Sequence, residues 1–317
     1  MKTFAFVFPG QGSQAVGMLD AWGDHPAVTE TLREASDALD QDIGRLINEG
    51  PKESLALTTN TQPVMLVAGV AAWRAWIAEG GDLPSVVAGH SLGEYSALVA
   101  SGALTLAEAA PLVRFRAQAM QQAVPVGVGA MAAILGMDAE KVKAGCAEVT
   151  RAFGAASAEV VEAVNFNDPL QTVIAGSKAA VDKACEVLKA SGAKRALPLS
   201  VSAPFHSSLM KPAAEALRER LASVALVAPR IPVINNIDVS VTSDPEFIRD
   251  ALVRQAAGPV RWVETVRALK ARGVEVIVEC GPGKVLAGMA KRIEPEISAA
   301  SVYDPATLAE TRQLLGA

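Results

Sequence analysis

The chain has 317 residues, of which 50% are hydrophobic, and a formal net charge of −5. This length and composition are those of a globular protein with a large buried core and one to three domains. The acidic balance, with no long run of like charges, argues against nucleic acid as a partner.

The cysteines predict a reducing compartment, and the apolar segments predict neither a signal peptide nor a membrane span. The chain has three cysteines, Cys146, Cys185 and Cys280. They lie far apart in the sequence and have neither a C-x-x-C spacing nor the spacing of metal ligands. We expect buried thiols rather than disulfides or a metal site, and the cytoplasm as location. The apolar start is too short for a signal peptide. The longest uncharged apolar stretch, 64–73, falls well short of the ~20 residues that span a bilayer, so we expect no membrane segment.

The chain begins with a predicted strand, Phe4–Phe8, which runs into the glycine-rich loop Pro9–Gln14. No Gly-Lys-Ser/Thr follows, so this is not a phosphate-binding loop. Because open α/β sheets bind ligands at the carboxyl ends of strands, Gln11 and Gln14 are candidate donors, or else ordinary loop amides. An apolar helix is predicted next, with Thr61 as its cap and Glu79 near its end.

The stretch from Pro84 to Ala100 predicts a strand, a sharp turn and a helix. Ser91 lies at the turn, with Gly89 two residues before it and Gly93 two after it. In this G-x-S-x-G pattern a strained elbow exposes the hydroxyl, and the glycines allow the turn and the close approach of strand and helix. Ser91 is therefore a candidate nucleophile, or alternatively a solvent-facing helix cap. The N–H of Leu92 is the natural first donor of an oxyanion hole.

A capping box, Thr105-Leu-Ala-Glu108, opens a helix that reaches about Ala123 and is expected to be interrupted or kinked near Pro111. Arg114 and Arg116 lie two residues apart on this helix, about 200° around its axis, and cannot face the same side.

From about Gly127 the order of predicted elements becomes β-α-β-β-α-β, a ferredoxin-like unit. Its strands and helices are expected at 131–136, 138–149, 160–166, 172–175, 178–190 and 195–199. Helices near 208–222, 246–256 and 262–272 and strands at 231–235 and 274–279 then resume the earlier alternation, before a last helix, strand and short helix.

Strands that alternate with helices predict a mostly parallel sheet covered on both faces, with the smaller unit beside it. We therefore predict an α/β fold with a large domain at 1–126 and 200–317 and an inserted ferredoxin-like subdomain at 127–199. The cleft between the two is the expected site.

A serine nucleophile requires a base, and the chain has three histidines. His25 lies in a loop before a helix, remote from the elbow in sequence. His90 precedes Ser91 directly, so its ring is expected to turn away from the hydroxyl and to be a structural, hydrogen-bonded group. His206, in a loop that leaves the small unit, remains as the candidate base. No acid between Ser91 and His206 stands out, so a neutral group such as a main-chain carbonyl is a candidate orienting partner.

The chain carries these motifs in order: Phe8-Pro-Gly-Gln-Gly-Ser-Gln14, Gly89-His-Ser-Leu-Gly-Glu94, Arg116 followed by Met120-Gln121, Val164-Asn-Phe-Asn167, Ala203-Pro-Phe-His206 and Gly281-Pro-Gly-Lys-Val-Leu286. Together they resemble the malonyl-CoA:acyl carrier protein transacylases of fatty acid synthesis, over essentially the whole chain. The resemblance implies an α/β-hydrolase-like large domain that carries a ferredoxin-like small one.

The resemblance also implies a ping-pong transfer. Ser91, activated by His206, attacks the malonyl thioester, and the N–H groups of Gln11 and Leu92 hold the oxyanion. Coenzyme A leaves, and the phosphopantetheine thiol of acyl carrier protein takes the malonyl group, with no cofactor of the enzyme's own. A main-chain carbonyl in the segment 253–255, which we assign to Gln255, steadies the histidine.

The remaining site residues follow from the same resemblance. Arg116 holds the malonyl carboxylate, for which a guanidinium fork is suited. Asn165 and Asn167 are expected to line the cleft. The family usually has glycine where this chain has Ala117, which narrows the expected approach to the guanidinium. Phe205 is typical of malonyl-selective polyketide acyltransferases, whereas many bacterial enzymes have serine there, so malonyl is favoured over methylmalonyl.

Acyl carrier proteins are acidic, so a local basic patch is needed for docking on this acidic chain. The candidates are Lys189, Lys194, Arg195, Lys284, Lys291 and Arg292, unless they form only a solvated face. We expect a monomer. Three other functions stay open: a serine hydrolase, an acyltransferase of different acyl specificity, and a non-catalytic thioester-binding subunit.

Overall fold

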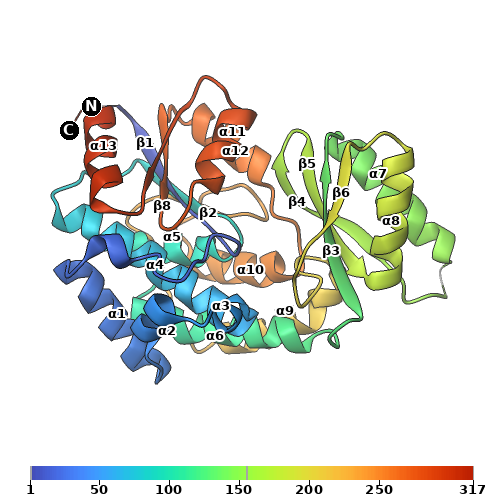
Figure 1. Ribbon diagram of the computed structural model, residues 1–317, viewed down its shortest axis with the longest axis horizontal. Helices are drawn as coiled ribbons and strands as arrows, with labels where there is room; N and C mark the ends of the chain where they lie inside the picture. The colour runs from blue at the N-terminus through green and yellow to red at the C-terminus, as the bar shows by residue number, and fades with distance from the viewer. Residues whose placement is uncertain (1, 155, 317) are drawn as a thin grey trace.

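The computed structural model of the protein describes residues 2–154 and 156–316. A five-stranded sheet, sheet A, lies in one part of the molecule, and a four-stranded sheet, sheet B, lies beside it (Figure 1). The N- and C-terminal ends of the chain meet, because Lys2 N–H donates a 3.0 Å hydrogen bond to the Leu315 carbonyl.

Sheet A has the strand order β7-β2-β1-β8-β9, and every neighbouring pair is parallel. Its strands are β1 (Phe4–Phe8), β2 (Val86–Gly89), β7 (Val233–Ile234), β8 (Val276–Cys280) and β9 (Ser298–Val302). Parallel strands end at the same edge of a sheet, so the loops after β1, β2 and β7 come together there.

Both faces of sheet A are buried, because successive side chains of a strand point to opposite sides. On β1, Phe4, Phe6 and Phe8 belong to one core cluster, whereas Ala5 and Val7 belong to another. The first cluster includes side chains of α1 (Pro26–Leu39), α2 (Ile43–Glu49), α3 (Lys52–Ala56), α4 (Thr58–Ala78), α5 (Gly93–Ala100), α6 (Leu106–Gln122), α9 (Lys211–Leu221), α10 (Pro245–Ala256) and α13 (Pro305–Leu315). The second includes side chains of α11 (Trp262–Ala271) and α12 (Val285–Ile293).

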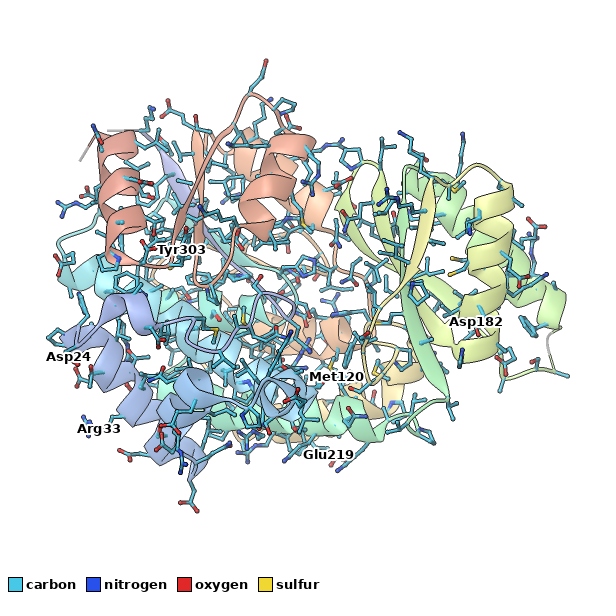
Figure 2. All side chains as sticks on the ribbon, viewed as in Figure 1. Asp24, Arg33, Met120, Asp182, Glu219 and Tyr303 are labelled. Atoms are coloured by element: carbon cyan, nitrogen blue, oxygen red, sulfur yellow. The ribbon has the colours of Figure 1, made fainter. Side chains whose placement is uncertain are left out.

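Sheet B is antiparallel, with the strand order β4-β5-β3-β6. Its strands are β3 (Gly129–Leu135), β4 (Val161–Asp168), β5 (Gln171–Ser177) and β6 (Arg195–Pro198). Two helices, α7 (Ala139–Phe153) and α8 (Lys178–Ala190), cover one face and form a separate core cluster with it. Figure 2 shows Asp182 of α8 on the side of sheet B that faces away from sheet A, while Met120 of α6 lies near the middle of the molecule.

These two sheets confirm the predicted fold class, an α/β protein with a parallel sheet and a ferredoxin-like unit. All of sheet B, α7 and α8 lie within 129–198. The domain boundaries at 126 and 199 stay a prediction. The two parts join through the backbone, since Phe166 N–H donates to the Val260 carbonyl and Val260 N–H donates to the Val164 carbonyl.

Some predicted element bounds were wrong. Helix α4 begins at Thr58 rather than Thr61, whose hydroxyl bonds back to the Leu55 and Leu57 carbonyls instead of capping. Helix α6 continues through Pro111 without interruption, and β7 has only two residues. Helices α2 and α3 were not predicted from the sequence, and α1 was predicted without bounds. Short 3-10 turns occur at Asp20–Trp22 and Ser208–Met210.

Across residues 2–154 and 156–316, every helix falls short of the length and apolarity that a bilayer crossing requires. In the same part of the chain, no three His, Cys, Asp or Glu side chains are grouped in a way that could hold a metal ion. Cys146 and Cys280 are buried, but Cys185 is only partly buried, which corrects the expectation of three buried thiols.

Candidate active site

Ser91 lies at the turn between β2 and α5 with a left-handed backbone. Its φ is 52°, a conformation that costs a residue with a side chain about 1–2 kcal/mol. Such strain persists only where the surrounding contacts fix it, and it is typical of functional positions. The backbone therefore has the geometry of a nucleophile elbow.

The two glycines of the elbow are required by close packing. A Cβ on Gly89 would lie 1.9 Å from the Gly93 carbonyl carbon, and a Cβ on Gly93 would lie 2.0 Å from the Phe8 carbonyl oxygen. The start of α5 thus rests directly on the end of β1. Only glycine at both positions lets helix, turn and neighbouring strand approach this closely.

We expect Gly93→Ala to lower the free energy of unfolding by about 3 kcal/mol, because its new methyl group meets backbone that cannot move aside. Urea unfolding of the purified variant measures this. Gly288→Ala is the matched control, since a Cβ there lies 3.5 Å from its nearest neighbour and glycine is unfavourable in a helix. A Gly93→Ala protein as stable as the parent contradicts the close approach described here.

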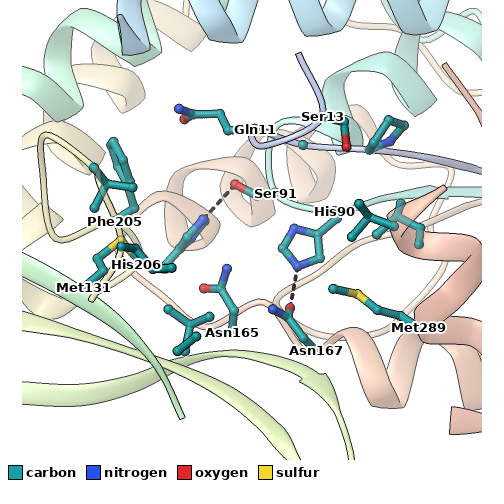
Figure 3. A pocket seen from close by; sticks show the side chains of 18 of the residues that line it. Gln11, Ser13, His90, Ser91, Met131, Asn165, Asn167, Phe205, His206 and Met289 are labelled. Atoms are coloured by element: carbon teal, nitrogen blue, oxygen red, sulfur yellow. Dashed lines mark hydrogen bonds between the residues drawn. The ribbon is translucent and has the colours of Figure 1, made fainter. Parts of the chain in front are cut away.

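His206 lies against the Ser91 hydroxyl. The two side chains come from loops 115 residues apart, and the distance between Ser91 Oγ and His206 Nε2 is 2.7 Å (Figure 3). The other ring nitrogen, Nδ1, lies 3.0 Å from the Gln255 carbonyl and 3.2 Å from the Gly258 carbonyl. Because a carbonyl only accepts, the proton resides on Nδ1 and Nε2 is free to accept the serine proton.

The imidazole of His206 is neutral at ordinary pH. Burial, together with the nearby positive charge of Arg116, lowers its pKa to about 3. Its backbone is also left-handed, with a φ of 68°. The two carbonyls orient the ring without adding a buried negative charge, so no carboxylate is needed as a third member. A neutral, oriented imidazole that touches a serine hydroxyl can act as a general base.

Two main-chain N–H groups near Ser91 have no partner within residues 2–154 and 156–316: those of Gln11 and Leu92. The Leu92 side chain is buried, so only its backbone serves the site. Gln11 belongs to the loop after β1, which lies next to the elbow because Phe8 is in register with Gly89. These are the donors predicted for an oxyanion.

Arg116 presents a buried positive charge beside the serine. Its side chain is 2% exposed, and Nη2 donates to Ser91 Oγ at 3.2 Å. Nη1 donates to the Gln62 side chain at 2.7 Å, and Nη2 also donates to the Gln255 side chain at 3.0 Å. Burial lowers the pKa of the guanidinium, but arginine starts so far above neutral that it stays charged.

No carboxylate forms an ion pair with Arg116 within the described ranges, and its Nε–H has no partner there. The nearby Glu94 carboxyl bonds to Gln255 Nε2 and to the Asn236 N–H instead. Burial raises the pKa of Glu94 to about 7, although these hydrogen bonds and Arg116 oppose the rise. Neutral amides thus surround the guanidinium and leave its charge available to an anion.

These groups face one cavity of about 270 Å³ between the two sheets. The residues of sheet B in its wall are Met131, Ala133, Asn165, Asn167, Gln171 and Val173. The remaining lining comes from the loops after β1, β2 and β6 and from α4, α6 and α12. The cleft predicted between the two parts is therefore the place where Ser91, His206 and Arg116 meet.

The other histidines lie where the sequence analysis expected. His90 Nε2 is 2.8 Å from Asn167 Oδ1, and Figure 3 shows its ring directed away from the Ser91 hydroxyl. His25 caps α1 by accepting from the Ala27 N–H. Neither histidine contacts the serine hydroxyl.

The structure places the other candidate residues as follows. Asn165 and Asn167 both line the cavity. Gln14 bonds within its own loop, to the Gly12 N–H, and is an ordinary loop amide. Ala117 is buried and does not line the cavity, and the narrowing expected near the guanidinium stays a prediction. Arg114 turns from the site to Gln41.

Sequence analysis missed the amides that hold the charged groups, Gln62 and Asn236, and the side-chain role of Gln255. Gln62 is fully buried, and its Nε2 donates to the Gln11 side chain at 3.2 Å. An amide beside Pro63 in an otherwise apolar helix was the available signal, because buried polar groups require partners. The sequence gives no comparable signal for Asn236.

Known proteins resemble this chain over its whole length. The family profile described as "Acyl transferase domain" matches residues 5–308. A Salmonella typhimurium protein named malonyl CoA-acyl carrier protein transacylase is 51% identical over 309 residues, which are 97% of this chain and 98% of that protein.

Solved structures agree with this likeness. The acyl-carrier-protein S-malonyltransferase of Burkholderia pseudomallei superimposes with a TM-score of 0.95 at 65% identity, over 99% of this chain and 100% of that one. A malonyl-transacylase in complex with its type II PKS acyl-carrier protein has a TM-score of 0.95 at 49% identity, with the same coverage of 99% and 100%. The chain therefore belongs to the malonyl CoA-acyl carrier protein transacylase family of the acyl transferase domain.

Proposed function

We propose that the protein transfers a malonyl group from malonyl-CoA to the phosphopantetheine thiol of an acyl carrier protein. In the first half, Ser91 Oγ attacks the thioester carbonyl carbon and its proton passes to His206 Nε2. The carbon–sulfur bond then breaks, coenzyme A leaves with that proton, and malonyl-serine remains. In the second half, the carrier thiol gives its proton to His206, attacks the ester and restores the Ser91 hydroxyl.

The charge that develops on the carbonyl oxygen requires donors that already point at it. The N–H groups of Gln11 and Leu92, which have no partner in the described part of the chain, are suited to this, and Leu92 additionally lies at the positive end of α5. An oxyanion hole of this kind stabilises the transition state more than the flat thioester.

Arg116 selects an acyl group that ends in a carboxylate. One charged hydrogen bond contributes about 1.5–3 kcal/mol, which corresponds to roughly 10- to 150-fold discrimination against acetyl. Phe205, which lines the same cavity with Met131, favours malonyl over the branched methylmalonyl. The observation that carries the proposal is that a buried guanidinium, without an ion pair among the described residues, lies 3.2 Å from the Ser91 hydroxyl, which His206 contacts at 2.7 Å.

The proposal is tested by mixing the protein with malonyl-CoA and measuring its intact mass, with and without holo acyl carrier protein. We expect one malonyl group per chain, its disappearance when the carrier is added, and no adduct in Ser91→Ala. A parent protein that never gains malonyl contradicts the transferase and supports a non-catalytic thioester-binding subunit.

The same mixtures separate the transferase from a serine hydrolase. A hydrolase passes the acyl-serine to water, so free malonate accumulates at the same rate with or without the carrier protein. A transferase releases little malonate and forms malonyl carrier protein instead. Rapid hydrolysis with no transfer contradicts the proposal.

The pH dependence of acylation reports on His206. Because its pKa is lowered to about 3, the base stays unprotonated, and we expect the acylation rate to change by less than about threefold between pH 5 and 7.5. Malonyl-pantetheine is the substrate of choice, since it has no phosphate that titrates there. A Glu94→Gln variant serves as control, because Glu94 has a pKa of about 7. If the acylation rate of this variant still falls as the pH is lowered, with a midpoint near pH 6.5, the lowered pKa of His206 is contradicted.

Each proposed step moves an acyl group between a hydroxyl and a thiol, so the reaction needs no cofactor. We propose that the enzyme works as a monomer, since one chain supplies the whole site, and, from its cysteine pattern, that it is located in the cytoplasm. The acidic carrier is proposed to dock on basic residues near the cavity. Arg292 is less available for this than expected, because it pairs with Asp168 at 2.7 Å.

A further inference from the structure

Asn236 bridges the two peptide groups on either side of His90. Its side-chain Nδ2 donates to the Gly89 carbonyl at 2.6 Å, and its Oδ1 accepts from the Ser91 N–H at 2.7 Å. Asn236 is fully buried and does not line the cavity. An amide is suited to this place because it donates and accepts at once, whereas an ionised carboxylate only accepts.

The bridge spans the strained part of the elbow. Gly89 is the last residue of β2, and Ser91 has its φ at 52°. With both peptide groups held, the turn cannot relax toward an unstrained backbone. The direction of the Ser91 side chain and of the next N–H, that of Leu92, follows from this backbone conformation.

Asn236 is itself held in place. It follows β7, which pairs with β2 through Val87 and Val233, so its loop lies beside the elbow. Its N–H donates to the Glu94 carboxyl at 2.9 Å, and Glu94 belongs to the first turn of α5. The backbone of Asn236 is thus held by the same helix that follows the nucleophile.

We propose that Asn236 is a positioning residue that sets the direction of the Ser91 hydroxyl and of the Leu92 N–H for the acylation step. The inference rests on the proposed function and deepens it. Asn236 does not itself line the cavity and makes no hydrogen bond to Arg116, so substrate binding does not depend on it directly. Its loss therefore lowers the rate of acylation at saturating malonyl-CoA and leaves the affinity for malonyl-CoA unchanged.

The adjacent Asn235 provides a matched control. It is also buried, and its side chain makes hydrogen bonds to the Ser240 carbonyl, the Ser240 hydroxyl and the Asp238 N–H. None of these groups belongs to the elbow. A role in stability alone predicts similar behaviour for Asn235→Ala and Asn236→Ala, whereas a positioning role separates them.

The experiment is quenched-flow acylation by saturating malonyl-CoA, followed by intact mass, on the parent, Asn235→Ala and Asn236→Ala. We expect the rate to fall about 100-fold in Asn236→Ala, because a shift of about 1 Å in a reacting group has an effect of this size. Asn235→Ala is expected to stay within about threefold of the parent. Calorimetric affinity for malonyl-CoA, measured in a Ser91→Ala background, is expected to change less than threefold on adding Asn236→Ala.

The outcomes distinguish the possibilities. Equal rates in the two asparagine variants, or an affinity that falls as far as the rate, overturn the positioning role. If the parent itself forms no adduct, the proposed function fails instead. Should Asn236→Ala not fold, Asn236→Asp keeps the shape and the acceptor for the Ser91 N–H but loses the donor to Gly89. We then expect about a tenfold lower rate, and a parent-like rate overturns the inference.

Discussion

His206→Ala is expected to slow acylation of Ser91 by malonyl-CoA about 10³- to 10⁴-fold. The imidazole is the group that can take the serine proton, since its Nε2 lies 2.7 Å from Oγ and burial keeps it neutral. Without it, the hydroxyl must attack while still protonated. Quenched-flow mass spectrometry of the first turnover measures the rate directly and separates it from carrier binding.

His25→Ala is the matched control for this change. The His25 ring also hydrogen-bonds to the backbone, because its Nδ1 accepts from the Ala27 N–H. Its Nε2 lies 3.2 Å from Glu79 Oε1. Its loss is expected to reduce thermal stability and to leave the acylation rate unchanged. If His206→Ala acylates within tenfold of the parent, the proposed base is wrong.

The second large effect is a change in acyl preference. Arg116→Ala is expected to lower kcat/KM for malonyl-CoA about 100-fold while acetyl-CoA is used as well as before or better. The variant also leaves the side chains of Gln62 and Gln255 without their charged partner. Any effect of that disturbance is shared by the two acyl groups, so the ratio of the two kcat/KM values isolates the carboxylate contact.

Two arginine variants sharpen this measurement. Arg114 lies on the same helix, and its guanidinium donates to the Gln41 side chain outside the site. We expect Arg114→Ala to leave the ratio of the two kcat/KM values unchanged. Arg116→Lys keeps the charge but lacks the planar fork, so an intermediate ratio is expected. Equal losses for malonyl and acetyl in Arg116→Ala indicate that Arg116 is structural.

Local patterns were sufficient for much of this protein. The G-x-S-x-G elbow was recognised because its requirements are met within five residues, and its glycines pack as that pattern implies. The order β-α-β-β-α-β predicted sheet B, because each of its elements is bounded by its own turn and periodicity. The short helices α2 and α3 were missed, since a few residues carry too little periodicity to be distinguished from a loop.

The pairing of Ser91 with His206 was reached by elimination among three histidines, which succeeds only where the candidates are few. The side chains that hold Ser91 and Arg116 in place could not be found by elimination. Gln62, Gln255 and Asn236 are uncharged amides, a common residue type in loops and helices, and each contacts the site from a distant part of the chain.

The sequence by itself determined the elbow, the two sheets and the candidate nucleophile and base, and the family resemblance of its motifs identified the candidate carboxylate-binding arginine. Only the tertiary structure decided how these groups are held. Asn236 meets Ser91 across 145 residues because β7 is placed next to β2, and Gln255 meets Arg116 across 139 residues. The physical reason is that strand and helix formation depend on nearby residues, whereas the partner of a buried polar group depends on which elements pack side by side.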